Sequence, residues 1–153
     1  MKKKSPTPSR FAALLLLGAT TFTSPGCVSV VPYAPNTTLV DARGFPEIHR
    51  TASEVLNRAL DPHITTVDIT EAYLQYGWTG TYVGPFWNPI TTSHESRIYF
   101  ANVARVELYA NHNVFVWGPQ DQRVDKILFA TSEDACLFLD CLMSLRATRK
   151  PAG

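Results

Sequence analysis

The hydrophobic pattern of this 153-residue chain changes period twice, from helical to strand-like and back to helical. Apolar residues recur at helical spacing in a first segment, predicted as a helix from Pro46 to Asp61, which contains Ile48, Ala52, Val55, Leu56 and Ala59. They do so again near the end of the chain, at Ala135, Phe138, Leu139, Leu142 and Leu145. The segments between are short and rich in β-branched and aromatic residues. The pattern therefore predicts an α+β fold with an antiparallel sheet of about six strands between an N-terminal helix and a C-terminal capping helix.

Several local signals divide the middle of the chain into strands. "RIYFANVARVELYA" predicts two strands with a kink at Ala101 and Asn102, and "NHN" and "PQDQ" predict turns on either side of the strand "VFVWG". In "RVDKILFA" we expect Val124, Ile127 and Phe129 to face the core, with one shift of register. Thr131 and Asp134 have the spacing of a capping box at the start of the last helix.

The stretch "IYFANVARVELY … VFVWG … KILFATSEDACLFLDCLMSL" resembles the second half of a pleckstrin-homology-like (PH-like) domain. The likeness covers roughly residues 64 to 147 and rests on strand order and the apolar-rich final helix. It implies an antiparallel sandwich or partial barrel with one open end closed by the C-terminal helix. The long N-terminal helix departs from that pattern. No basic phosphoinositide-binding loop is present, so headgroup binding is not implied.

The N-terminal segment has the pattern of a targeting signal. A basic stretch from Met1 to Arg10 precedes an apolar run that ends near Phe22. That run is too short to cross a hydrocarbon core of about 30 Å as a helix, but it has the length of a signal-peptide core. Small residues at 24 and 26 then precede Cys27. Residues 1–26 are predicted to be a signal peptide.

"FAALLLLGATTFTSPGC" resembles a bacterial lipoprotein signal, which implies that Cys27 carries the lipid anchor. Residues 27–42 are then a tether, and 43–150 form a single domain. Ser24 stands where leucine is commonest, and Pro25 is unusual at its place, so a secretory cut that leaves Cys27 as a free thiol stays open. In a Gram-negative host, Val28 after the cysteine favours the periplasmic face of the outer membrane.

Charge and reactive residues narrow the function classes. Beyond residue 26 the chain has 10 basic and 13 acidic side chains, a net charge of −3, which argues against nucleic acid as a partner and against electrostatic docking on anionic lipid. The four histidines lack metal-ligand spacing, and no carboxylate pair is brought together by spacing. We therefore predict no catalytic residue, no metal and no cofactor.

The remaining cysteines do not predict an internal disulfide. Cys136 and Cys141 lie on one predicted helix, separated by about 140° around its axis, and cannot bridge without melting it. Cys136 is the better candidate for an intermolecular bond.

One segment stands apart, "YGWTGTYVGPFWNPITTSHES", residues 76 to 96. Its glycines and prolines are expected to break any regular ladder, and its rings are costly to expose. Either the loop folds over the barrel and completes the core, or it contacts a partner or ligand, or it dips into a membrane. The candidate partner-binding residues are Trp78, Tyr82, Phe86 and Trp87.

These observations lead to two functional hypotheses. The first is an exported lipoprotein, held on the cell envelope by its lipid, with a non-catalytic binding or structural module and a possible envelope protein partner. The alternative is a soluble secreted protein that holds a small apolar ligand in a barrel mouth lined by the aromatic loop.

Overall fold

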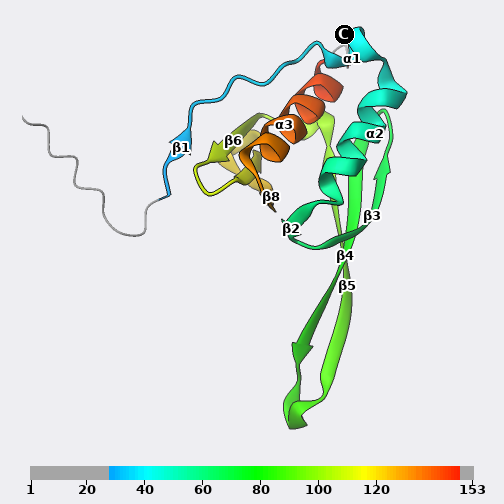
Figure 1. Ribbon diagram of the computed structural model, residues 1–153, viewed down its shortest axis with the longest axis vertical. Helices are drawn as coiled ribbons and strands as arrows, with labels where there is room; N and C mark the ends of the chain where they lie inside the picture. Colours follow the sequence, from blue (N-terminus) through cyan, green and yellow to red (C-terminus); the bar gives the residue numbers. More distant parts are fainter. Residues whose placement is uncertain (1–27, 149–153) are drawn as a thin grey trace, which may run out of the picture.

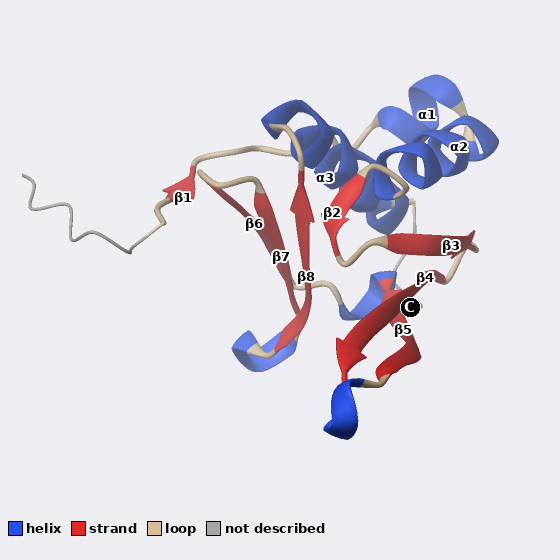
Figure 2. Ribbon diagram, turned by 60° about the horizontal axis from the view of Figure 1, so that its bottom comes forward, coloured by secondary structure: helices blue, strands red, loops and turns tan. Residues whose placement is uncertain are grey.

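A computed structural model describes residues 28–148 and contains two antiparallel sheets of five and three strands together with three α-helices (Figures 1 and 2). The helices are α1 (Leu39–Arg43), α2 (Phe45–Leu56) and α3 (Ser132–Ala147). The five-stranded sheet has the order β1 (Val30–Val31), β6 (Arg105–Tyr109), β7 (Asn113–Trp117), β8 (Arg123–Phe129) and β2 (Ala59–Asp61). The three-stranded sheet has the order β3 (Ile64–Ile69), β4 (Tyr73–Val83) and β5 (Pro89–Tyr99). The predicted α+β class with antiparallel sheets and a C-terminal helix is confirmed.

Helix α3 is the element around which the core forms. The Thr131 side chain accepts a hydrogen bond from the backbone N–H of Asp134 at 3.1 Å, which satisfies one of the free donors of the first turn. The helix contacts α1, α2 and strands of the five-stranded sheet, so it is covered on several sides. All the apolar residues that the helical spacing singled out are buried, namely Ala135, Phe138, Leu139, Leu142 and Leu145.

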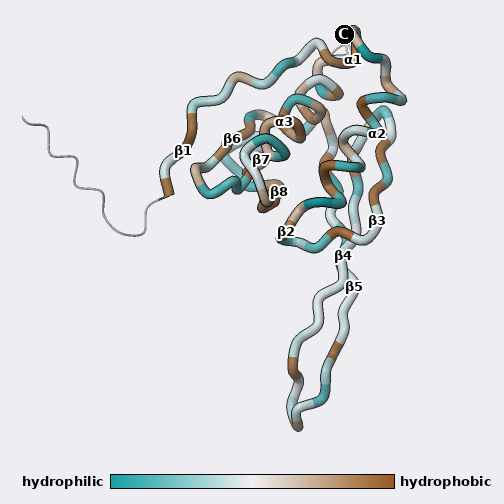
Figure 3. Tube along the Cα trace, viewed as in Figure 1, coloured by the Kyte–Doolittle hydropathy of each residue, from teal (hydrophilic) through white to brown (hydrophobic). Residues whose placement is uncertain are grey.

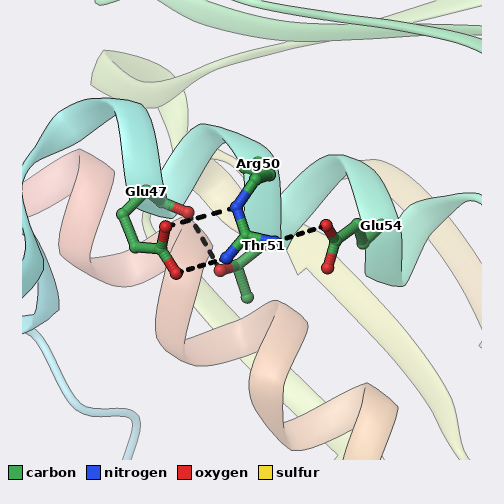
Figure 4. A network of polar contacts seen from close by, with 4 residues as sticks. All are labelled: Glu47, Arg50, Thr51 and Glu54. Atoms are coloured by element: carbon green, nitrogen blue, oxygen red, sulfur yellow. Dashed lines mark hydrogen bonds and ion pairs between the residues drawn. The ribbon is translucent and has the colours of Figure 1, made fainter.

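Helix α2 is amphipathic and lies beside α3 (Figure 1). Its apolar side chains Ile48, Ala52, Val55 and Leu56 are fully buried. On the exposed side, the Arg50 guanidinium bridges Glu47 at 2.6 Å and Glu54 at 2.7 Å (Figure 4). Because these ion pairs are solvated, they contribute little to stability, and the buried side decides where the helix packs.

The predicted helix from Pro46 to Asp61 is too long at its C-terminal end. It ends at Leu56, and β2 (Ala59–Asp61) pairs instead with β8. Ala59 is buried as expected, but it is buried in a strand opposite Phe129. Pairing with a neighbouring strand has overridden the helical spacing.

The segment before α1 lies against the domain. Strand β1 pairs with β6 at the edge of the five-stranded sheet. Further along, the Tyr33 hydroxyl donates to the Asp140 carboxylate at 2.6 Å, and the backbone N–H of Asn36 donates to the same oxygen at 2.7 Å. Residues 28–42, interpreted from the sequence as a tether, thus contact both the sheet and α3. Cys27 lies outside the described residues.

The two sheets meet through a polar contact at the base of β4 and β5. The Asp125 carboxylate on β8 accepts hydrogen bonds from the Tyr76 hydroxyl at 2.7 Å and the Ser96 hydroxyl at 2.6 Å. Tyr76 is buried, and this burial is the main cause that raises the pKa of its phenol. The negative charge of Asp125 raises the pKa further. The contact ties β4 and β5 to β8 near the base of the hairpin.

Two local predictions have different outcomes. The kink at Ala101 and Asn102 is confirmed as a 3₁₀ turn, Phe100–Asn102, between β5 and β6. The expected register shift is confirmed and lies between Val116 and Trp117 of β7, but Val124 lies at that shift without a paired residue and is 36% exposed instead of facing the core. Ile127 and Phe129 are buried as expected.

Candidate contact site on the β4–β5 hairpin

Strands β4 and β5 form a long hairpin that projects away from the rest of the domain (Figures 1 and 2). Each strand has 11 residues, and the register runs without a shift from Tyr73 opposite Tyr99 to Val83 opposite Pro89. Strand β3 pairs with β4 only as far as Trp78, so the outer part of the hairpin has no third strand. The expectation that glycines and prolines would break the ladder is wrong here.

The glycines and prolines of this segment occupy positions that a ladder tolerates. A Cβ on Gly77 would lie 2.6 Å from the Thr66 hydroxyl of the neighbouring strand, so that position needs a residue without a side chain. Pro89 is the first residue of β5, a place where a proline costs no ladder hydrogen bond.

The polarity of the hairpin falls from its base to its end. At the base, the Arg97 guanidinium donates to the Gln75 side chain at 2.7 Å, and Gln75 donates to Glu95 at 3.3 Å. From Thr79 to Ser93 the sequence has no charged residue. Figure 3 colours most of this outer part in near-neutral tones, with hydrophobic residues and one hydrophilic segment close to its end.

Three of the four candidate contact residues are exposed. Phe86 is 91% exposed, Trp87 is 89% exposed and Tyr82 is 53% exposed. Trp78 is partly buried nearer the base, where its ring lies 5.7 Å from that of Tyr76 and is stacked on His94 at 5.4 Å between centroids. The structure thus separates Trp78 from the other three, and the hairpin end consists of Tyr82, Phe86 and Trp87 with their apolar neighbours.

A five-residue loop, 84–88, closes the hairpin and turns its two aromatic rings outward. The backbone N–H of Gly84 donates to the Asn88 carbonyl at 2.8 Å. Between them, Phe86 has φ +68° and Trp87 has φ +63°. Left-handed backbone is uncommon for residues with bulky side chains, and such strain often accompanies a functional position.

A second loop in the same chain has the same backbone but polar side chains. Residues 118–122 connect β7 to β8, and the N–H of Gly118 donates to the Gln122 carbonyl at 2.8 Å. Gln120 and Asp121, each with φ +58°, occupy the positions that correspond to Phe86 and Trp87. Both loops also begin with Gly-Pro. This turn therefore forms without aromatic residues, and the rings of loop 84–88 are not required by its backbone.

Sequence reasoning missed another group of aromatic residues, on the outer face of the five-stranded sheet. Tyr109, Phe115 and Trp117 form a row whose adjacent centroids are 4.8 Å and 6.1 Å apart. The Trp117 indole N–H donates to Glu107 at 2.8 Å, and the Arg105 guanidinium lies 4.6 Å from the Trp117 ring centroid. The alternation in "VELYANHNVFVW" is the signal that could have located them. Their partners lie within the domain, which distinguishes them from Phe86 and Trp87.

Among residues 28–148, no group of three or more His, Cys, Asp or Glu side chains is placed to hold a metal ion. Cys141 is fully buried, and burial raises the pKa of its thiol to about 12, which suppresses the reactive thiolate. Cys136 is a free cysteine, less buried than Cys141.

The predicted contact residues also do not line the surface depression beside α1. That open depression is lined by Val40, Phe45, Glu71 and Thr148.

Within the described range, no helix has the length and apolar character needed to span a membrane. No protein-family model, curated protein or solved structure matches the chain.

Proposed function

We propose that this protein is a lipid-anchored lipoprotein of the cell envelope whose domain acts as a non-catalytic contact module. In this proposal the β4–β5 hairpin is the contact arm, and Phe86, Trp87 and Tyr82 are its contact residues. The observation that carries the proposal is the pairing of two exposed aromatic rings with a loop backbone that forms elsewhere in the chain around Gln120 and Asp121. Exposed rings that the fold does not need are best explained by something they bind.

The exposure of the hairpin end favours an arm over the wall of a ligand cavity. A ring that lines an enclosed cavity is covered by the other walls, whereas Phe86 and Trp87 are about nine-tenths exposed. The apolar-ligand alternative places these same rings around a barrel mouth, and no observation on the hairpin favours it.

The proposed lipid on Cys27 rests on the sequence. The segment that follows Cys27 packs against the domain, and this bears on how far the domain would lie from the membrane. Strand β1 begins at Val30, three residues after Cys27, and pairs with β6. An acyl chain on Cys27 would then hold the domain close to the membrane surface, because little free chain separates the anchor from the sheet. The net charge of −3 beyond residue 26 adds no electrostatic attraction to that surface.

We also propose that the fold is PH-like. The order of elements supports it, since β3, β4 and β5 form one antiparallel sheet, β6, β7 and β8 follow in a second, and α3 ends the domain. Helices α1 and α2 and strands β1 and β2 are additions to that pattern. An experimental structure tests the proposal, because a PH-like domain requires α3 to close one open end between the two sheets.

Anchoring is tested by Cys27→Ser. The wild-type protein should incorporate labelled fatty acid and partition into the detergent phase, and the variant should do neither. Labelling that persists in Cys27→Ser would contradict lipidation at this residue.

Contact through the arm is tested by photo-crosslinking in cells. A photo-reactive amino acid at position 87 should give crosslinks to an envelope component, either protein or lipid. The matched control carries the same group at position 120, the corresponding turn of loop 118–122. Equal crosslinking from both positions, or none from position 87, would contradict the contact role.

A further inference from the structure

We infer that the end of the β4–β5 hairpin inserts into the interfacial region of a lipid bilayer. This inference rests on the proposed function, because it specifies the chemistry of the contact that the arm makes. It concerns residues 82–90, in which Tyr82, Val83, Phe86, Trp87 and Ile90 are all exposed.

Both faces of the outer hairpin combine threonine or serine with apolar residues towards the end. Side chains alternate between faces along a strand, so the register separates them into two sets. One face carries the pairs Gly80–Thr92 and Tyr82–Ile90. The other carries Thr79–Ser93, Thr81–Thr91 and Val83–Pro89. A groove on a protein would distinguish one face from the other, whereas a bilayer surrounds an inserted hairpin on all sides.

Polarity along the hairpin follows the polarity across a bilayer interface. The end is mainly aromatic and aliphatic, with Asn88 as its one strongly polar side chain. The next pairs are rich in threonine and serine, and the charged residues Glu95 and Arg97 occur only at the base. Charged side chains are costly in the hydrocarbon region, while Trp and Tyr are enriched at membrane–water interfaces. Fifteen residues, 79–93, contain no charge, which is what insertion requires.

Backbone hydrogen bonding limits how deeply the hairpin can insert. The β4–β5 ladder is continuous to Val83 and Pro89, and the Gly84–Asn88 bond closes the loop. The outward-facing groups of both edges are unpaired beyond the end of β3, and such groups are costly in hydrocarbon. The hairpin can therefore insert only its end, to about 5–10 Å, the depth that interfacial segments reach.

A protein partner is the main competing explanation. Protein interfaces usually surround an apolar centre with a polar rim that carries part of the specificity. The outer hairpin has no charged residue for such a rim, and its apolar end carries exposed side chains on both faces, so a partner would have to enclose it. The observations favour the bilayer.

The experiment uses the full-length lipidated protein, reconstituted into phosphatidylcholine vesicles with or without brominated acyl chains. Bromines quench tryptophan only at close range, and Trp87 lies at the hairpin end while Trp78 and Trp117 are partly buried in the domain. We expect bromolipids to quench the emission of the wild type and to leave that of Trp87→Phe nearly unchanged. Quenching of equal size in Trp87→Phe would overturn the inference.

A second measurement separates the anchored membrane from an opposing one. The vesicles that hold the lipidated protein contain no bromine, and brominated phosphatidylcholine vesicles are added afterwards. Quenching only after this addition indicates insertion into an opposing bilayer, and quenching only in the first arrangement indicates insertion beside the anchor. Either result supports the inference, and the absence of quenching in both overturns it.

The control for the rings themselves is the double variant Phe86→Gln with Trp87→Asp, which gives loop 84–88 the side chains of loop 118–122. Carried in the Cys27→Ser background, it should bind phosphatidylcholine vesicles roughly 100-fold more weakly than Cys27→Ser alone, since two buried rings are lost. Binding of both Cys27→Ser proteins to phosphatidylcholine vesicles, with and without the two ring substitutions, should be insensitive to salt. An unchanged affinity of the double variant would overturn the inference.

The inference and the proposed function can fail separately. Crosslinking from position 87 to a protein, together with no quenching by bromolipids, would overturn the bilayer inference and leave the contact arm standing. The absence of both crosslinking and quenching would overturn both.

Discussion

Replacing the two rings at the hairpin end is expected to leave the stability of the fold nearly unchanged. The variant is Phe86→Gln with Trp87→Asp, the pair of residues that loop 118–122 carries at φ +58°. Full burial of an aromatic side chain contributes about 1.5–3 kcal/mol. Since these rings are 91% and 89% exposed, only about a tenth of that is lost from each, roughly 0.5 kcal/mol together.

The matched contrast is Tyr76→Ala at the base of the same hairpin. Its ring is 1% exposed and its hydroxyl donates to Asp125, so truncation should cost about 3–5 kcal/mol. Urea unfolding followed by far-UV circular dichroism measures both free energies without relying on tryptophan emission. A loss above about 2 kcal/mol in the double variant would mean that the rings support the fold, and the contact role would be refuted.

Three further predictions concern the body of the domain. Leu142→Ala should lower the free energy of unfolding by about 2–5 kcal/mol, because Leu142 is fully buried on α3, and a loss below about 0.5 kcal/mol in denaturant melts would make the helix peripheral. Tyr33→Phe should cost about 1 kcal/mol, through the lost hydrogen bond to Asp140, and an unchanged melt would mean that the N-terminal segment is not held at this point. Burial lowers the pKa of His49, so the folded state disfavours its protonated form, and stability should fall as the pH drops from about 6.5 towards the folded pKa. His49→Gln should flatten that part of a pH series of urea melts, and an identical pH slope would contradict the assignment to His49.

The sequence was most informative where a regular period coincided with burial. The spacing along α3 identified its buried residues, and Thr131 marked its start, because a one-sided apolar pattern and a cap are local properties. The same logic located the buried residues of α2 but extended that helix to Asp61. Pairing of β2 with β8 is a contact between distant segments, which the local spacing of residues 59–61 does not encode.

The average behaviour of glycine and proline predicts a broken ladder, but the hairpin is regular. Gly77 is required because Thr66 approaches it closely, and Pro89 is the first residue of a strand. Both features depend on how the strands pair, which the sequence of the segment alone does not reveal. Phe86 and Trp87 are exposed because the β4–β5 hairpin extends beyond the rest of the domain. That extension is a property of the whole fold. The candidate contact residues were nevertheless among those that the aromatic composition of the segment singled out.

One signal for loop 84–88 is visible in the sequence when it is compared with loop 118–122. "GPFWN" and "GPQDQ" occupy corresponding turns, and both close with a 2.8 Å hydrogen bond from the glycine N–H to the carbonyl of the fifth residue. The two loops share one backbone conformation but carry aromatic side chains in one case and polar side chains in the other. The turn therefore requires the backbone conformation and does not require the aromatic rings.

The most direct test of this account is the depth of Trp87 in the bilayer. The lipidated protein is reconstituted into vesicles whose bromines lie either near the headgroups or near the chain ends, and Trp87→Phe supplies the background from Trp78 and Trp117. The account predicts that quenching which depends on Trp87 is stronger with bromines near the headgroups, because the unpaired edges of the hairpin restrict it to the interface. Equal emission from Trp87 in both kinds of vesicle and in vesicles without bromine would contradict it.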